Sequence, residues 1–197
     1  MKTRKNNFSR LLDSGFWILD SKSSRRGQSL IEAMVAISLL TTGFLGLVAL
    51  LSRSFFLNRV ISDETTANYL AAEGIEIAKN LIDHDVYLQL AGAPGATGWG
   101  TCFSVHNDVE LDYATTDCNQ LAPYNSANPD VLMFNPTTHL YGYGQGGNAA
   151  ATGFTREIQV SESVPNQITV DSIVRWSTGP VTSQSIRLED VFYNWHP

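Results

Sequence analysis

The chain has 197 residues, of which 43% are hydrophobic and 16% charged, and its formal net charge is −6. This length has room for one domain of ordinary size plus an appendage and excludes two large enzymatic domains, since domains most often run to about 100 to 150 residues. The first 27 residues carry seven Lys or Arg against two Asp, whereas the remaining 170 carry six basic and 17 acidic residues. An acidic body of this kind argues against a broad nucleic-acid surface, because phosphate binding depends on clustered Lys and Arg.

A long uncharged segment follows the basic amino end. Residues 33–52 are 20 residues without a charge, between Glu32 and Arg53. As a helix they would extend about 30 Å, the thickness of a bilayer's hydrocarbon core. A secretory signal has a shorter apolar part, of about 7 to 15 residues, and ends at a small-x-small cleavage site. The segment therefore predicts a membrane span, with the basic end in the cytoplasm and the acidic remainder outside.

The start of this segment contains an unusual acid. Arg25 and Arg26 precede Gly27, and Glu32 follows that glycine by five residues. An acid costs about 2.5 to 3.5 kcal/mol at the centre of a membrane on insertion scales, and less near the interface, so it is a functional candidate. Its natural partner is a cation. Cleavage after Gly27 would supply one as the α-amino group of Gln28, on the same chain or on a neighbour.

Residues 25–36, RRGQSLIEAMVA, resemble the processing site of type IV pilins and pseudopilins. In that family a prepilin peptidase cuts after the glycine, the new first residue is N-methylated, and the glutamate at the fifth mature position pairs with a neighbouring amino terminus during assembly. The resemblance implies cleavage between Gly27 and Gln28, methylation of Gln28, and an assembly role for Glu32. Most family members begin the mature chain with Phe or Met, so Gln28 departs from the pattern. The alternative is a single-pass signal anchor whose glycine and acid fall there by chance.

The helical pattern continues beyond the apolar run. There is no proline between Gln28 and Pro94, and apolar residues recur at threes and fours, which predicts one helix over about residues 30–83. Its apolar stripe would pack against a carboxyl-terminal sheet. The stripe comprises Phe56, Val60, Ala67, Leu70, Ala71, Gly74, Ile77, Ala78 and Leu81. Residues 41–46, TTGFLG, are its weakest part. In the family this zone can extend in a filament, and close helix contact through small residues is the alternative.

The rest of the chain predicts a β-rich head. Residues 91–100, AGAPGATGWG, predict a loop. Short extended segments are expected at 102–105, 109–113, 131–134 and 139–141. Apolar and polar residues then alternate around Ile158 and Val160, from Ile168 to Trp176, and around Ile186 and Leu188. Separated by turns, these three segments predict an antiparallel meander.

The expected fold is therefore α+β, with a long amino-terminal helix packed on a small antiparallel sheet. Its parts are a basic leader peptide at 1–27, a transmembrane and assembly half of the helix at 28–52, an amphipathic half at 53–85 and an extracellular head at 86–197. This order matches the architecture of pilins, which the resemblance implies.

The two cysteines, Cys102 and Cys118, both fall in the part assigned to the exterior. Disulfides persist in that environment. A bridge would close a loop of about 15 residues, which the chain-entropy model values at roughly 3 kcal/mol. The alternative is a pair of free thiols in a reducing compartment.

No polar cluster predicts a catalytic, metal or cofactor site. Residues 83–85, Asp-His-Asp, could bind a metal, but consecutive helical residues do not share a face, so a solvated helix end is expected. Residues 106–108 form a polar turn by the same reasoning, and residues 117–119 offer two or three oxygens where calcium needs six to eight. There is no Gly-x-Ser-x-Gly elbow, and neither cysteine has the flanks of a thiol protease. Scattered aromatic residues could stack with nucleobases or sugars and leave adhesion open, although such residues in a β-rich head more often pack in the core or in loops; they are Trp99, Tyr124, Tyr141, Tyr143 and Trp195.

These features predict a structural subunit rather than an enzyme, namely a minor pilin or pseudopilin of a type IV pilus-like or type II secretion-like filament. The implied partners are the prepilin peptidase and methyltransferase, other pilin subunits, and an assembly platform with its ATPase. The protein is expected first in the cell membrane, with its leader cytoplasmic and its head outside, and then in an extracellular filament. The alternative from another class is a membrane-anchored extracellular binding or adhesion protein that never polymerises.

Overall fold

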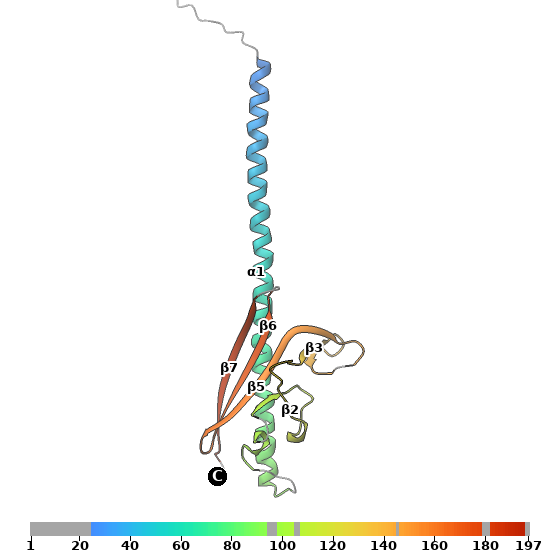
Figure 1. The fold of residues 1–197 in the computed structure, drawn as a ribbon, viewed down its shortest axis with the longest axis vertical. Coiled ribbons are helices and arrows are strands. Elements are labelled where there is room, and N and C mark those ends of the chain that lie inside the picture. Colours follow the sequence, from blue (N-terminus) through green and yellow to red (C-terminus); the bar gives the residue numbers. More distant parts are fainter. Residues whose placement is uncertain (1–24, 94–97, 105–106, 145, 179–181, 196–197) are drawn as a thin grey trace, which may run out of the picture. The chain divides into compact units, whose positions relative to one another are not determined.

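The computed structural model describes residues 25–93, 98–104, 107–144, 146–178 and 182–195 (Figure 1). Residues 1–24, which make up most of the predicted leader, lie outside the described residues. The described residues fall into two units, one ending at residue 53 and the other beginning at residue 54.

One helix, α1 (Arg25–Leu90), accounts for every described residue up to Leu90. The absence of proline between Gln28 and Pro94 permits this length, because nothing interrupts the backbone ladder. The helix continues seven residues beyond the predicted end at Asp83, so the expectation of a solvated helix end at residues 83–85 is wrong. Asp83 and His84 are exposed, but Asp85 is buried on the side that faces the sheet.

In the described part of the second unit, seven antiparallel strands form one sheet. They are β1 (Asp108–Glu110), β2 (Ala122–Pro123), β3 (Val131–Asn135), β4 (Leu140–Gly142), β5 (Ala150–Val164), β6 (Gln167–Ser177) and β7 (Ser183–Tyr193). The predicted meander is confirmed as β5, β6 and β7, with β6 in the centre. The predicted segments at 131–134 and 139–141 are confirmed as the hairpin of β3 and β4.

The shorter strands share the other edge of β5. Its first half pairs with β3, for example Thr155 with Val131, and its second half pairs with β1, for example Ile158 with Val109. The expected extended segment at 102–105 is wrong, because residues 101–103 form a short 3₁₀ helix, η1 (Thr101–Phe103). Gly100 supplies the left-handed φ of 74° that starts this turn.

The core lies between the carboxyl-terminal part of α1 and one face of the sheet, and Figure 1 shows β5, β6 and β7 beside this part of the helix. Alternate residues of β5 and β6 point to the helix, as the period of a strand requires. One cluster joins α1 residues 75–82 to the disulfide loop and includes Phe103, Val109, Leu111, Ile158, Val160, Ile168 and Val170. A second cluster joins Ala67, Leu70 and Ala71 to Leu132, Phe154, Val174 and Trp176.

Candidate functional site

The first part of α1 is an exposed apolar surface. Every residue from Gln28 to Arg53 is exposed, and the large apolar side chains from Leu30 to Leu51 are between 42% and 72% exposed. By length and composition the helix is sufficient to cross a membrane. A continuous apolar surface of this extent needs a cover of lipid or protein, because soluble proteins rarely expose large apolar patches.

Hydroxyl groups inside this segment find partners on the helix itself. Ser38 Oγ donates to the carbonyl of Met34. Thr41 Oγ1 and Thr42 Oγ1 both donate to the carbonyl of Ser38, at 2.9 and 2.7 Å. These bonds satisfy the hydroxyl donors without water, which is what a hydrocarbon environment demands of polar groups.

The predicted processing and assembly residues lie together in the first turns of α1. The backbone of Gly27 is helical, and Gln28 and Glu32 are exposed. Gln28 and Glu32 are four residues apart, so they lie on the same face of the helix, one turn from each other. The sequence from 28 to 52 contains no Lys or Arg, and Glu32 is its one charged residue. Glu32 is thus the one charged residue on a surface that is otherwise uncharged and mainly apolar.

In the second unit, Arg156 joins the sheet to α1. This arginine lies on the helix-facing side of β5 and is 0% exposed. Its Nη1 donates to the carbonyl of Leu70 at 2.9 Å and to Glu73 Oε2 at 3.0 Å, and its Nη2 donates to the carbonyl of Leu111. The guanidinium therefore bonds to α1 and to the segment after β1 at once. Sequence reasoning missed this role, although a basic residue at the same strand parity as Phe154 and Ile158 was a signal for it.

Gly74 marks a close approach of α1 to the sheet. A Cβ atom at this position would lie 2.5 Å from Ser172 Oγ and 2.7 Å from Ile158 Cδ1. No side chain fits at these distances without movement of its neighbours. The glycine therefore lets Arg156 reach the helix carbonyl and the Glu73 carboxylate, which lie one turn and one residue before it.

The opposite face of the meander is polar. Arg175 Nη1 lies 2.6 Å from Glu157 Oε2 and donates to Tyr124 Oη at 3.1 Å. Arg187 Nε donates to Asp171 Oδ1 at 2.7 Å. The side chains of Arg175 and Arg187 are 41% and 56% exposed, whereas those of their partners Glu157 and Asp171 are only 6% and 8% exposed. Water therefore reaches both guanidinium groups on this face, although their carboxylate partners are buried, whereas the Arg156 guanidinium is fully buried.

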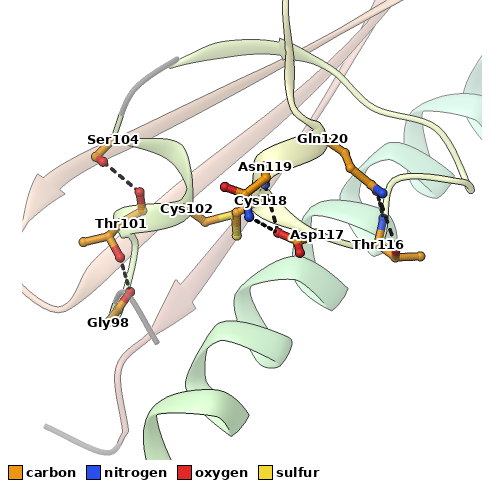
Figure 2. Close-up of a disulfide and its surroundings, with 9 residues drawn as sticks. All are labelled: Gly98, Thr101, Cys102, Ser104, Thr116, Asp117, Cys118, Asn119 and Gln120. Carbon is orange, nitrogen blue, oxygen red and sulfur yellow. Dashed lines mark hydrogen bonds between the residues drawn. A yellow bond between two sulfur atoms is a disulfide. The ribbon is translucent and has the colours of Figure 1, made fainter. Parts of the chain in front are cut away.

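The disulfide fastens the loop that follows α1. Cys102 and Cys118 are bonded, with sulfurs 2.08 Å apart and Cα atoms 5.2 Å apart, which agrees with the pairing expected from the sequence. The bridge joins η1 to a second 3₁₀ helix, η2 (Cys118–Gln120) (Figure 2). Asp117 caps η2, since its Oδ1 accepts from the backbone N–H and the side-chain amide of Asn119, each at 2.9 Å. The Asp117 carboxylate is thus engaged within its own turn, and the described residues contain no group of three or more candidate metal ligands.

Glu110 is a buried carboxyl at the end of β1 and the basis of a prediction about pH. Burial raises its pKa, a backbone N–H bond from Asp130 partly opposes the rise, and the charge of Asp130 adds to it. The folded state consequently holds a proton to higher pH than the unfolded chain does. The stability associated with the protonated carboxyl is present below the ordinary pKa of glutamate and is lost as the pH rises through the raised value.

We therefore expect Glu110→Gln to unfold at a higher temperature than the wild type at pH 7, because the amide has no charge to desolvate and can still accept from the Asp130 N–H. The difference should shrink as the pH falls to about 4, near the ordinary pKa of a glutamate. Thermal unfolding of both proteins in detergent over pH 4 to 7 measures it. A constant difference across this range would contradict the assignment.

Two hollows lie along one flank of α1. The first, of about 380 Å³, is lined by Thr66, Tyr69, Leu70 and Glu73 of the helix and by His139, Leu140 and Tyr141. The second, of about 460 Å³, is lined by Glu73, Glu76, Ile77, Asn80, Leu81 and His84 and by Tyr113, Thr115 and Thr116. Both contain Glu73, and at 3.6 residues per turn their helix residues form one stripe. We call the two hollows together the α1 groove.

The aromatic residues considered for adhesion do not form one surface. Tyr141, Tyr143 and Trp99 are partly buried against the core clusters. The ring of Tyr124 lies under the guanidinium of Arg175, whose Cζ is 5.8 Å from the ring centroid. Trp195 is 73% exposed.

Comparison with known proteins adds no relative. No family model matches the chain, and neither the curated proteins nor the solved structures contain a match.

Proposed function

We propose that the chain is a subunit of a type IV pilus-like or type II secretion-like filament, in the manner of a minor pilin or pseudopilin. In this proposal a prepilin peptidase cuts between Gly27 and Gln28, the first part of α1 anchors the subunit in the membrane, and an assembly platform with its ATPase moves it into the filament. The head remains outside the membrane and determines what the filament contacts.

The observation that carries the proposal is the exposed apolar helix with Glu32 one turn after Gln28. An acid in an apolar span costs about 2.5 to 3.5 kcal/mol at the bilayer centre, so an ordinary anchor has no reason to contain one. A cut after Gly27 creates a cationic amine on Gln28. Because both residues are on the exposed face of a bare helix, the carboxylate of one copy is accessible to the amine of another.

The surrounding features support the same function. The apolar surface from Leu30 to Leu51 suits lipid before assembly and neighbouring helices after it. The second unit has its own core, a disulfide and a helix clamped to the sheet through Arg156, which suits a head that stays folded while the apolar segment exchanges its surroundings.

Processing gives the direct test of the proposal. Peptide mass analysis of membrane-extracted protein should find a first residue at Gln28, carrying an N-methyl group if the family's second reaction also occurs. Gly27→Leu should leave the chain uncut, whereas Gly15→Leu, which changes a glycine inside the leader, should leave processing intact. A wild-type chain that still begins at Met1 in cells with an active prepilin peptidase would overturn the proposal.

A further inference from the structure

A second exposed apolar feature follows the uncharged segment. Phe55 is 70% exposed and Phe56 is 57% exposed, and the exposed Arg59 lies one turn after Phe55. The 20 uncharged residues of 33–52 already match the thickness of the hydrocarbon core. The two phenylalanines are therefore not needed to complete the membrane span. Aromatic residues and arginine are enriched at protein–protein interfaces, so two exposed aromatic rings beside a cation indicate a protein contact.

The α1 groove has the complementary composition. Its first hollow combines the 72%-exposed ring of Tyr69 with Leu140, which is 40% exposed, and with the half-buried Tyr141. Its second hollow begins with two acids, Glu73 and Glu76. The groove is thus apolar and aromatic at one end and acidic immediately beyond it.

The spacing of the two features agrees along the helix. Phe55 precedes Arg59 by four residues, and Tyr69 precedes Glu73 by four residues. A single shift of 14 residues, about 21 Å along a helix axis, places the phenylalanine beside the tyrosine and the arginine beside the glutamate. Glu76 lies within the next turn, inside the reach of the same arginine side chain. The offset that aligns the phenylalanine with the tyrosine therefore leaves Glu76 less than one turn beyond the arginine.

We infer that the segment Phe55–Arg59 of one copy docks in the α1 groove of a second copy, with its phenylalanines against Tyr69 and Leu140 and its arginine against Glu76. The two helices run parallel, since both chains are anchored by the same end. This inference rests on the proposed function and adds to it a contact between subunits outside the membrane. It would set the axial offset of neighbours independently of Glu32.

Charge complementarity favours a second copy of the chain over other occupants of the α1 groove. Glu73 is already paired with Arg156, but Glu76 is exposed and takes part in none of the ion pairs found among the described residues. Arg59 is likewise exposed and outside those pairs. An acid and a base on one chain, separated by more than four turns of helix, have reason to meet only between copies.

An exchange of charges tests the contact in the full-length protein. Arg59→Glu and Glu76→Arg should each lower the amount of the subunit recovered in sheared filaments by at least about tenfold, because each places like charges together. The double variant R59E/E76R should restore recovery to near the wild-type amount. Glu76 is chosen over Glu73 so that the Arg156 clamp remains intact. The matched control is Glu64→Arg, an exposed acid half a turn around α1 from Glu73, which should assemble normally.

Crosslinking between copies gives a second test of the docking contact. A photoreactive phenylalanine at position 55 should crosslink to the peptide that contains Tyr69, or to the one that contains Leu140, in another copy. Single variants that assemble normally, a double variant that is not restored, or crosslinks to lipid alone would each overturn the inference. If those results came from chains that are still cut after Gly27 and recovered in filaments, the proposed function would stand and the docking alone would be wrong.

Discussion

Replacing Glu32 with Ala is expected to reduce incorporation into filaments by at least about tenfold, the effect of losing 1.4 kcal/mol or more of pairing energy. The carboxylate is the one charge in the exposed segment from 28 to 52, so no neighbouring acid can replace it. In low dielectric a charge pair is much stronger than in water, which makes the loss large. Quantitative immunoblots of sheared filaments and of membrane fractions measure the two populations.

Membrane insertion of the Glu32→Ala subunit should be equal to or better than that of the wild type, because the substitution removes the cost of placing an acid in the membrane. This separates an assembly defect from an anchoring defect. Glu32→Gln keeps the side-chain shape and removes only the charge, and it should fail in the same way. If either variant entered filaments at the wild-type level, the assembly role of Glu32 would be wrong. If the wild type formed no filaments, the non-polymerising membrane-anchored binding protein would be the better account.

The sequence predicted those parts of the fold that depend on local periodicity. The lack of proline and the repeat at threes and fours predicted α1, and the period-two alternation predicted β5, β6 and β7. The end of α1 at Leu90 was not predicted, because the polar residues 83–85 resemble a helix end in sequence. In the structure Asp85 is buried, and this tertiary burial has no signal in the local pattern. The 3₁₀ turn at 101–103 was missed for a similar reason, since its geometry depends on Gly100 and on the bridge from Cys102.

The candidate site likewise has a part that the sequence predicted and a part that it did not. Gly27, Gln28 and Glu32 are close in sequence, so their spacing on one helix already placed them together. The contacts of Arg156 join positions separated by 86 and 45 residues, and no local pattern carries that information. The α1 groove also needs residues 139–141 beside the helix, which only the pairing of β3 with β5 provides.

The contacts of Arg156 lead to the second large effect. Arg156→Met is expected to lower the free energy of unfolding by about 3 kcal/mol, at the lower end of the range for breaking a buried pair from one side. The side chain is fully buried, and its loss leaves the Leu111 carbonyl without this donor and Glu73 without its cation. The value is set low in the range because Glu73 is 30% exposed and water can partly replace the arginine.

Denaturant unfolding of the full-length protein in detergent measures this change, with the buried Trp176 and the partly buried Trp99 as fluorescent reporters. The matched variant is Arg175→Met, which removes a 41%-exposed arginine from the other face of the same sheet and should cost less than Arg156→Met, because its guanidinium is already partly hydrated. The double variant R156M/E73L should recover part of the loss, because removing both charges leaves no unpaired ion. Equal effects of the two arginine substitutions would show that the buried guanidinium of Arg156 is no more important for stability than the partly exposed one of Arg175, and its bonds to α1 would then not be what holds the helix to the sheet.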